Sequence, residues 1–322
     1  MEPLEHIRKA VERAKEHRGS DGQTQPQLGA ARQQVQFRAH ADNSGTSPRS
    51  DVMLNGARLE SNRIISHDVM DQRSKSFDML RTQVLQTMDT NSWQLLGVTS
   101  PTAGCGKSVI ATNLALSIAR QPEKSVLLVD MDLQQPQVAN HLGLECDQGL
   151  ISVLEGKSTL ARGIVPARVG NSRFLVLPCE RSVLNSSEWI TSRAMGVLLN
   201  DIKRHFKAWT VILDLPPILV SDDVISVLPQ IDCVLFVAAA GFSTAPQIKE
   251  CNKHLESTPV VRVVLNKAAD AAPGYYPYSY SRYGVSPAAQ AKTKSKRASK
   301  PIAFQQSVAS SFKRFVDRLG RF

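Results

Sequence analysis

The sequence predicts an α/β domain with a doubly wound, mostly parallel sheet, and two observations support this fold class. First, six short apolar segments lack the alternation of a half-buried strand: WQLLGVTS, SVLLVD, FLVLP, TVILDL, CVLFVAA and VVRVVLN. Second, helical stretches lie between them, among them KSVIATNLALSIAR and SEWITSRAMGVLLNDIKRHF. Buried strands that alternate with helices indicate a parallel sheet with helices on both faces.

Composition divides the chain into five segments. Residues 1–18 have apolar side chains at helical spacing and predict a short amphipathic helix. Residues 19–73 are rich in Gln, Ser, Gly, Asn and Arg, which predicts a flexible linker. A folded domain over 74–270, a tyrosine cluster over 271–284 and a basic tail with an amphipathic helix over 285–322 are predicted to follow.

The positive charge is concentrated near the C-terminal end. Of the formal net charge of +10, residues 274–322 carry +9 and residues 1–273 only +1. The whole-chain balance therefore says little about the folded domain, and we expect no nucleic-acid partner. The five cysteines show no CxxC pair or metal-ligand spacing, so we expect reduced thiols in a cytoplasmic protein. The sequence starts without an apolar signal segment, and its longest apolar run, CVLFVAAAG, is too short to cross a bilayer.

The segment SPTAGCGKS, residues 100–108, follows a predicted strand and opens a predicted helix, as a P-loop does. Glycines there let successive backbone N–H groups point at phosphate oxygens, and the helix N-terminus adds a favourable dipole. The motif is deviant, because Pro101 stands where GxxxxGK[ST] has its first glycine. An ordinary Gly-rich turn is the alternative. The candidate nucleotide-binding residues are Gly104, Cys105, Gly106, Lys107, Ser108 and Val109.

Three carboxylates end predicted strands after this loop: Asp130 and Asp132 in VLLVDMDLQQP, and Asp214 in TVILDLPP. Ligands of open α/β sheets bind at the carboxyl ends of strands, and oxygen ligands of this kind suit Mg²⁺. One strand-ending Asp alone is more often a turn or cap residue, but three after a P-loop favour a nucleotide site. We therefore expect ATP and Mg²⁺ as cofactors, with Ser108, Asp130, Asp132 and Asp214 as metal ligands.

All five tyrosines of the chain lie in GYYPYSYSRYG, residues 274–284. A packed core would distribute its aromatic residues along the sequence. Pro277 and the flanking glycines keep this segment out of the fold, so that its phenols are reachable. One interpretation of the cluster is an aromatic interaction patch.

Together these motifs resemble the bacterial tyrosine kinases of the capsular and exopolysaccharide type, which are P-loop kinases. The resemblance covers residues 74–284 and rests on TSPTAGCGKSVIATNLA (Walker A), VLLVDMDLQQP (Walker A′), VILDLPPILVSDD (Walker B), GLISVLEG, NSSEWITS, VVLNKA and the tyrosine cluster. It implies an ATP-dependent protein-tyrosine autokinase that regulates polysaccharide polymerisation and export.

The resemblance also implies roles for individual residues. Lys107 would hold phosphates, Asp130 would accept the tyrosine proton, and Asp132 and Asp214 would serve the metal. Asn266, in VVLNKA, would belong to the nucleotide site. The implied autophosphorylation sites, presented by one subunit to the next, are Tyr275, Tyr276, Tyr278, Tyr280 and Tyr283.

Two departures from the family pattern concern assembly and activity. The stretch KSFDMLR keeps only Arg81 of an ExxRxxR oligomerisation pattern, with Lys75 and Asp78 at the other positions. Gln134 and Gln135 stand where members of the family have arginines, which removes positive charge near the nucleotide.

The resemblance implies partners as well. Family members without transmembrane helices are activated by the cytoplasmic segment of a membrane polysaccharide co-polymerase, and they self-associate. From Phe304 onward, apolar residues at helical spacing among basic ones predict attachment to an anionic membrane surface. A helix packed on the kinase domain is the alternative. We expect a cytoplasmic protein, peripheral at the inner face of the plasma membrane.

Two other functions compete with the kinase. A Min- or partitioning-type ATPase shares this fold, but it carries a signature Lys five positions before the P-loop lysine, where this chain has Thr102. A catalytically weak nucleotide-binding scaffold of a polysaccharide export complex is consistent with Gln134 and Gln135. The tyrosine cluster favours the kinase over both.

Overall fold

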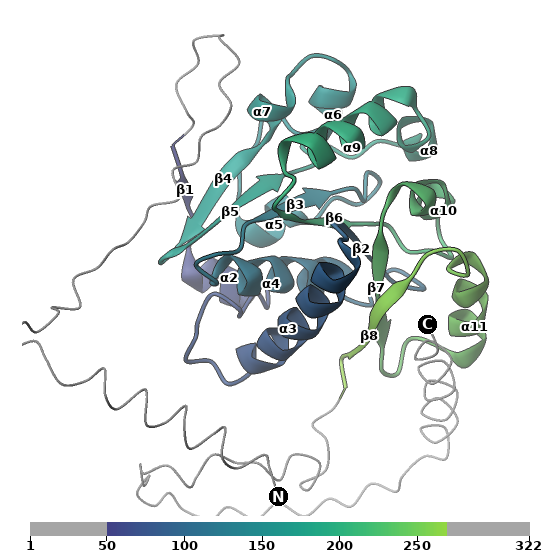
Figure 1. The fold of residues 1–322 in the computed structure, drawn as a ribbon, viewed down its shortest axis with the longest axis horizontal. Coiled ribbons are helices and arrows are strands. Elements are labelled where there is room, and N and C mark those ends of the chain that lie inside the picture. Colours follow the sequence, from purple (N-terminus) through teal and green to yellow (C-terminus); the bar gives the residue numbers. More distant parts are fainter. Residues whose placement is uncertain (1–49, 269–322) are drawn as a thin grey trace, which may run out of the picture. The chain divides into compact units, whose positions relative to one another are not determined.

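The computed structural model of the chain describes residues 50–268 (Figure 1). The predicted N-terminal helix, tyrosine cluster and basic tail therefore lie outside the described residues. Within this range eight strands form one sheet in the order β1-β4-β5-β3-β6-β2-β7-β8. Neighbouring strands are parallel, except that β4 runs antiparallel to β5. The predicted α/β class with a mostly parallel sheet is confirmed.

The six predicted strands correspond to β2, β3, β5, β6, β7 and β8. The strands of the sheet are β1 (Val52–Met53), β2 (Leu95–Thr99), β3 (Val126–Asp130), β4 (Val165–Val169), β5 (Ser172–Leu177), β6 (Thr210–Asp214), β7 (Cys233–Ala239) and β8 (Val260–Asn266). The helices are α2 (Gly56–Ser61), α3 (Ser74–Asn91), α4 (Lys107–Ala119), α5 (Val138–Leu142), α6 (Leu150–Leu154), α7 (Leu160–Gly163), α8 (Ser186–Ile190), α9 (Arg193–His205), α10 (Asp223–Val227), η1 (Leu228–Gln230, a 3₁₀ turn) and α11 (Ala245–His254).

The central strands are buried on both faces because helices cover each side of the sheet (Figure 1). In β3 the side chains alternate, so that Leu128 belongs to one apolar core and Leu127 to the other. Helices α3 and α4 contribute to the first core, and α9 and α11 contribute to the second. Within the described range no helix combines the length and apolar character needed to cross a membrane.

The linker predicted over 19–73 does not extend to residue 73. Strand β1 pairs with β4, and α2 follows it directly. Leu59 and Ile64 are fully buried in the core beneath α4. The prediction was wrong here because a few widely spaced apolar residues lie in polar sequence, and averaged composition does not register them.

Two further differences have local causes. The predicted helix SEWITSRAMGVLLNDIKRHF is two helices, because Ser192 adopts an extended conformation and its Oγ accepts a hydrogen bond from Met195 N at 3.2 Å. Ser192 is therefore the N-cap at which α9 begins as a separate helix. Strand β4 was not predicted, because VPARV is short and contains Pro166.

Candidate nucleotide site

The P-loop connects β2 to α4 and has the backbone conformation that its glycines predict. Gly104 and Gly106 have φ angles of +77° and +90°, which favour glycine. The side-chain nitrogen Nδ2 of Asn266 donates a hydrogen bond to the carbonyl oxygen of Cys105 at 2.9 Å. A Cβ atom on Gly106 would lie 2.3 Å from this Nδ2 atom. Asn266 therefore supports the loop from β8, and Gly106 is required by both conformation and space.

The first residues of the loop are fixed by the segment that follows β6. Strands β2 and β6 are parallel neighbours, so their carboxyl ends lie together. The Thr99 hydroxyl donates to the Pro216 carbonyl at 2.7 Å, and Ile218 N donates to the Ser100 carbonyl at 2.9 Å. The deviant Pro101 fits here, since its carbonyl accepts a hydrogen bond from Leu219 N at 3.1 Å. The Walker A and Walker B motifs thus form one connected unit.

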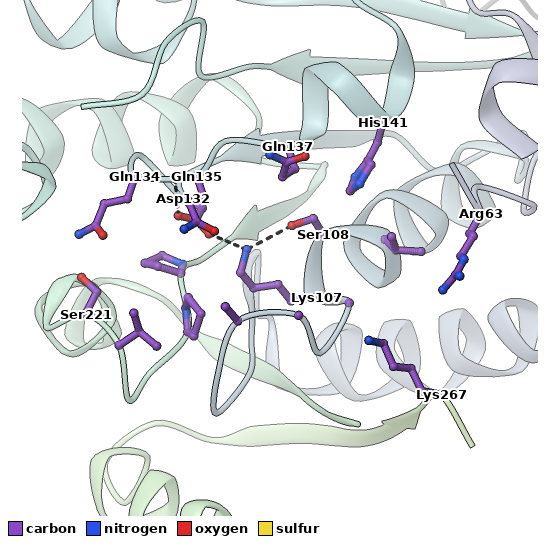
Figure 2. Close-up of a pocket in the computed structure, with 17 residues that line it drawn as sticks. Arg63, Lys107, Ser108, Asp132, Gln134, Gln135, Gln137, His141, Ser221 and Lys267 are labelled. Atoms are coloured by element: carbon purple, nitrogen blue, oxygen red, sulfur yellow. Dashed lines mark hydrogen bonds and ion pairs between the residues drawn. The ribbon is translucent and has the colours of Figure 1, made fainter. Parts of the chain in front are cut away.

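At the start of α4, Lys107 lies among the predicted partners. Its Nζ atom is 2.8 Å from Asp132 Oδ2 and 3.2 Å from the Ser108 hydroxyl oxygen (Figure 2). It also lies 3.5 Å from Asp214 Oδ1. Burial lowers the pKa of Lys107, but the nearby Asp214 and Asp132 charges outweigh it, so the pKa lies above its usual value. The lysine is charged, and its charge is balanced by Asp214 at the end of β6 and by Asp132 just after β3.

Asp214 has the features of a metal ligand. It is fully buried, and neither side-chain oxygen accepts a hydrogen bond of ordinary geometry from the part of the chain described here. Burial raises the pKa of Asp214, and the Lys107 charge opposes this rise. A buried carboxylate is costly unless cations lie close to it; Lys107 is one such cation, at 3.5 Å, and a bound metal ion would be a second. Together with Asp132 and the Ser108 hydroxyl, Asp214 supplies the oxygen ligands that suit Mg²⁺.

These ligands would hold Mg²⁺ only together with phosphate oxygens. Among residues 50–268, no group of three or more His, Cys, Asp and Glu side chains is arranged to hold a metal ion. Mg²⁺ at phosphate sites commonly takes one or two carboxylates and completes its coordination with substrate oxygens and water. The residues present therefore fit a metal that arrives with a nucleotide.

Asp130 lies in a different environment from the one expected of a base. It is fully buried, and its Oδ2 accepts hydrogen bonds from Gln137 N at 3.0 Å and Val138 N at 2.9 Å. Burial, and then the neighbouring Asp214 charge, raise the pKa of Asp130 well above its usual value. Its oxygens fix the turn before α5. Asp132, two residues on, is the carboxylate of this pair that lines the cavity.

The cavity in front of the P-loop has a volume of about 280 Å³ (Figure 2). Of the predicted residues, Gly104, Gly106, Lys107, Ser108, Val109 and Asp132 line it, as do Gln134 and Gln135. The Cys105 thiol is buried, with its sulfur 3.5 Å from the Ser243 hydroxyl and 3.6 Å from that of Thr102. Cys105 therefore contributes its backbone to the loop, while its side chain packs beneath it.

Three basic residues that line the cavity were not predicted as site residues from the sequence: Arg63, His141 and Lys267. Arg63 comes from the segment predicted to be a linker, His141 from α5 and Lys267 from the residue after β8. No motif contains Arg63 or His141. Lys267 belongs to VVLNKA, next to Asn266, and this was the one signal available in the sequence.

Comparisons with known proteins agree with this geometry. Residues 96–274, more than half of the chain, match the model of the CobQ/CobB/MinD/ParA nucleotide binding domain. The chain is 30% identical over 247 residues to EpsB of Ralstonia nicotianae, which covers 74% of this chain but only 32% of EpsB. The chain thus spans about a third of the length of that relative.

A further curated relative and a solved structure are tyrosine kinases. Tyrosine-protein kinase YwqD of Bacillus subtilis is 32% identical over 169 residues, which cover 52% of this chain and 69% of YwqD. The solved kinase domain of the Escherichia coli tyrosine kinase ETK superposes with a TM-score of 0.59 at 27% identity, covering 67% of this chain and 84% of that domain. The chain belongs to the CobQ/CobB/MinD/ParA family of nucleotide-binding domains and, within that fold, to the bacterial tyrosine kinases.

Proposed function

We propose that the chain is a Mg²⁺- and ATP-dependent protein-tyrosine autokinase of the capsular and exopolysaccharide type. The observation that supports this most directly is the contact of Lys107 with Asp132 and Asp214, at 2.8 Å and 3.5 Å. These distances bring the Walker A, A′ and B motifs to one point at the end of the P-loop. The sequence adds the acceptors, Tyr275, Tyr276, Tyr278, Tyr280 and Tyr283.

Phosphoryl transfer depends mainly on positioning and on charge stabilisation. In the proposed reaction, backbone N–H groups of the P-loop and Lys107 hold the β- and γ-phosphates of ATP. A tyrosine oxygen attacks the γ-phosphorus in line, the bond to the β–γ bridging oxygen breaks, and ADP leaves. Mg²⁺, held by Ser108, Asp132 and Asp214, neutralises charge on the phosphates when it is bound.

The proton of the attacking phenol needs an acceptor at the cavity wall. We assign this role to Asp132, because it lines the cavity and Asp130 is enclosed by backbone N–H donors. Asp130 then acts as a positioning residue, which holds the turn that carries Asp132. The expected assignment of the base to Asp130 is replaced in this proposal.

The test is incubation of the full chain with labelled ATP and Mg²⁺, followed by phosphotyrosine detection. Label on tyrosine that disappears in Lys107→Met, in a variant with all five tyrosines changed to Phe, and on chelation of Mg²⁺ supports the kinase. A matched control is Lys207→Met, which removes an exposed lysine remote from the cavity. ATP hydrolysis without phosphotyrosine would instead indicate a Min- or partitioning-type ATPase, and binding without either reaction would indicate a scaffold.

Self-association is also part of this proposal, but the ExxRxxR-like stretch is an unsuitable route. The Asp78 carboxylate accepts hydrogen bonds from the Ser117 hydroxyl at 2.7 Å, Arg120 Nη2 at 2.8 Å and Arg81 Nη1 at 3.1 Å. These contacts connect α3 to α4 within one chain. Asp78, which departs from the family pattern, and Arg81, which keeps it, are here committed to internal packing.

The proposed partners are the cytoplasmic segment of a membrane polysaccharide co-polymerase and, through the basic tail, an anionic membrane surface. Both proposals follow from the family resemblance and from the charge of residues 274–322. Co-sedimentation with anionic liposomes tests the second. A chain ending at residue 290 should bind less than the full chain, and equal binding would contradict membrane attachment.

A further inference from the structure

Two cations at the edge of the nucleotide cavity have unusual backbones. Three non-glycine residues in the range 50–268 have positive φ angles, namely Arg63 at 63°, Ser92 at 55° and Lys267 at 56°. Two of the three, Arg63 and Lys267, line the cavity, and both are exposed. We call them the rim cations. Strained backbones of non-glycine residues persist where the surroundings hold them, and they are concentrated at ligand sites.

The surroundings of Arg63 hold it firmly. The buried side chain of Asn113, on α4, donates a hydrogen bond to the Arg63 carbonyl at 3.0 Å. Its oxygen accepts two more, from Ile65 N at 2.8 Å and Ser66 N at 2.9 Å. On the other side, Asn62 Nδ2 donates to the His141 carbonyl at 3.1 Å. The segment that carries Arg63 is thus attached both to the P-loop helix and to α5.

The guanidinium of Arg63 is available to a ligand. Across residues 50–268 it makes no hydrogen bond or ion pair to another side chain, although its backbone makes several. Lys267 is similarly free of ion pairs within the same range; its Nζ lies 4.2 Å from the centre of the Phe242 ring. Lys267 N donates to Asn266 Oδ1 at 2.8 Å, so the residue that supports the P-loop also orients Lys267.

His141 adds a third group at this side of the cavity. Its ring Nδ1 is buried without a hydrogen-bond partner in the described part of the chain, and the residue lines the cavity. In Figure 2, Arg63 and Lys267 lie beyond Ser108, on the side of Lys107 opposite to Gln134 and Ser221. The carboxylates that contact Lys107 mark the γ-phosphate end, so the rim cations lie toward the nucleoside end.

We propose that Arg63, together with Lys267, binds the phosphate chain of the nucleotide near its nucleoside end. This inference rests on the proposed function of the same site. It assigns a nucleotide contact to the segment before the Walker motifs, and it places positive charge at the site in spite of Gln134 and Gln135. Since the Lys107 charge is balanced by Asp132 and Asp214, the rim cations supply charge that is not already paired.

The test measures binding of MgATP and MgADP to the full chain, without any turnover. Arg63→Met should weaken both nucleotides by about 10-fold, because one charge-assisted contact is lost. Arg63→Lys should recover part of this loss, and the double variant with Lys267→Met should weaken binding further. The control Arg73→Met removes an exposed arginine whose ion pair with Asp71 lies away from the cavity, and it should bind as the wild type does.

A second variant excludes misfolding as an explanation. Arg63→Gly relieves the positive φ, so its thermal midpoint without nucleotide should not fall below that of the wild type, while its nucleotide affinity should fall as for Arg63→Met. Unchanged affinity in both variants overturns the proposal. A loss for ATP alone would place Arg63 at the γ-phosphate and overturns the nucleoside-end assignment.

The outcomes also separate this inference from the proposed kinase. A wild-type chain that binds no nucleotide refutes both. A chain that binds nucleotide, depends on Arg63 and forms no phosphotyrosine supports the rim cations and refutes the kinase. Phosphotyrosine formation with affinity independent of Arg63 supports the kinase and refutes the rim cations.

Discussion

At the inner end of the cavity the charges are buried and paired, whereas at the rim they are exposed and make no ion pair among residues 50–268. Lys107 and Asp132 are 8% and 5% exposed and lie 2.8 Å apart. Arg63 and Lys267 are exposed, with strained backbones held by asparagines. The inner end is suited to chemistry, which requires fixed groups in a low dielectric, and the rim is suited to capture from water.

The two ends of the cavity also come from different parts of the chain. The inner end comes from residues at or shortly after the carboxyl ends of adjacent parallel strands, where the order of the sheet brings them together. The rim comes from a segment before α3 and from the end of β8, joined to the P-loop helix by single side chains. We therefore expect the reaction rate to depend on the side-chain chemistry of the inner end. We expect stability and nucleotide affinity to depend on the side chains that hold the rim in place.

The largest effect is expected at the inner end. Asp132→Asn should lower the rate of phosphotyrosine formation by about 10²–10³-fold, because it removes the proposed base and a metal ligand together. Single-turnover labelling with saturating ATP measures this rate. Asp89→Asn is the matched control, since Asp89 is exposed and its ion pair with Lys124 lies outside the cavity. Equal losses in both variants would show that the effect is not specific to the site.

The second-largest effect is expected on stability, at Asn113, whose side chain holds the segment that carries Arg63. Asn113→Ala should lower the free energy of unfolding by about 2–4 kcal/mol, because it leaves buried backbone groups at Ile65 and Ser66 unpaired. Urea titration measures the change, and nucleotide affinity should fall with it. Asn91→Ala removes one exposed hydrogen bond to the Thr87 carbonyl and should change the stability little. Similar behaviour of the two variants would contradict the anchoring role.

A smaller effect follows from the buried carboxylates. Burial raises the pKa of both Asp130 and Asp214 in the folded state above the ordinary value. A raised pKa gives stability that is complete below the ordinary pKa and is lost as the pH rises through the folded pKa. Stability of the metal-free protein should therefore fall between acid and neutral pH, by on the order of 1 kcal/mol.

The variant Asp214→Asn should reduce this pH dependence, since it removes one titrating carboxylate and a repulsive neighbour of Asp130. Unfolding in the presence of a chelator, between about pH 5 and about pH 7.5, measures the difference. The same variant should bind Mg²⁺ with ATP more weakly. A wild-type profile that rises toward neutral pH would refute the assigned sign.

The smallest expected effect is the salt dependence of ATP affinity, which distinguishes the exposed rim from the buried inner end. Exposed charges are screened by added ions, whereas buried pairs are screened much less. ATP affinity should fall by about 2–3-fold between about 0.05 M and about 0.5 M NaCl in the wild type. The dependence should be weaker in Arg63→Met, because the screened contact is already absent. An identical salt dependence in both would assign the screening to another part of the molecule.

By itself the sequence determined the fold class, the strands that carry the motifs and the residues of the inner end. These follow from short-range patterns: apolar runs of strand length, glycines before GKS, and acidic residues directly after a strand. Only the tertiary structure distinguished Asp130 from Asp132, because two carboxylates two residues apart look equivalent in sequence. Their difference depends on the backbone N–H groups of a later turn that only one of them reaches.

The rim likewise required the tertiary structure. The residues around Arg63 have a polar composition that predicts a linker, and nothing local marks Asn113 as the side chain that orders them. This contact joins positions fifty residues apart, through hydrogen bonds that depend on exact distance. Local patterns report burial and turn preference over a few residues, whereas the assembly of a rim from two distant segments is decided by packing of the whole domain.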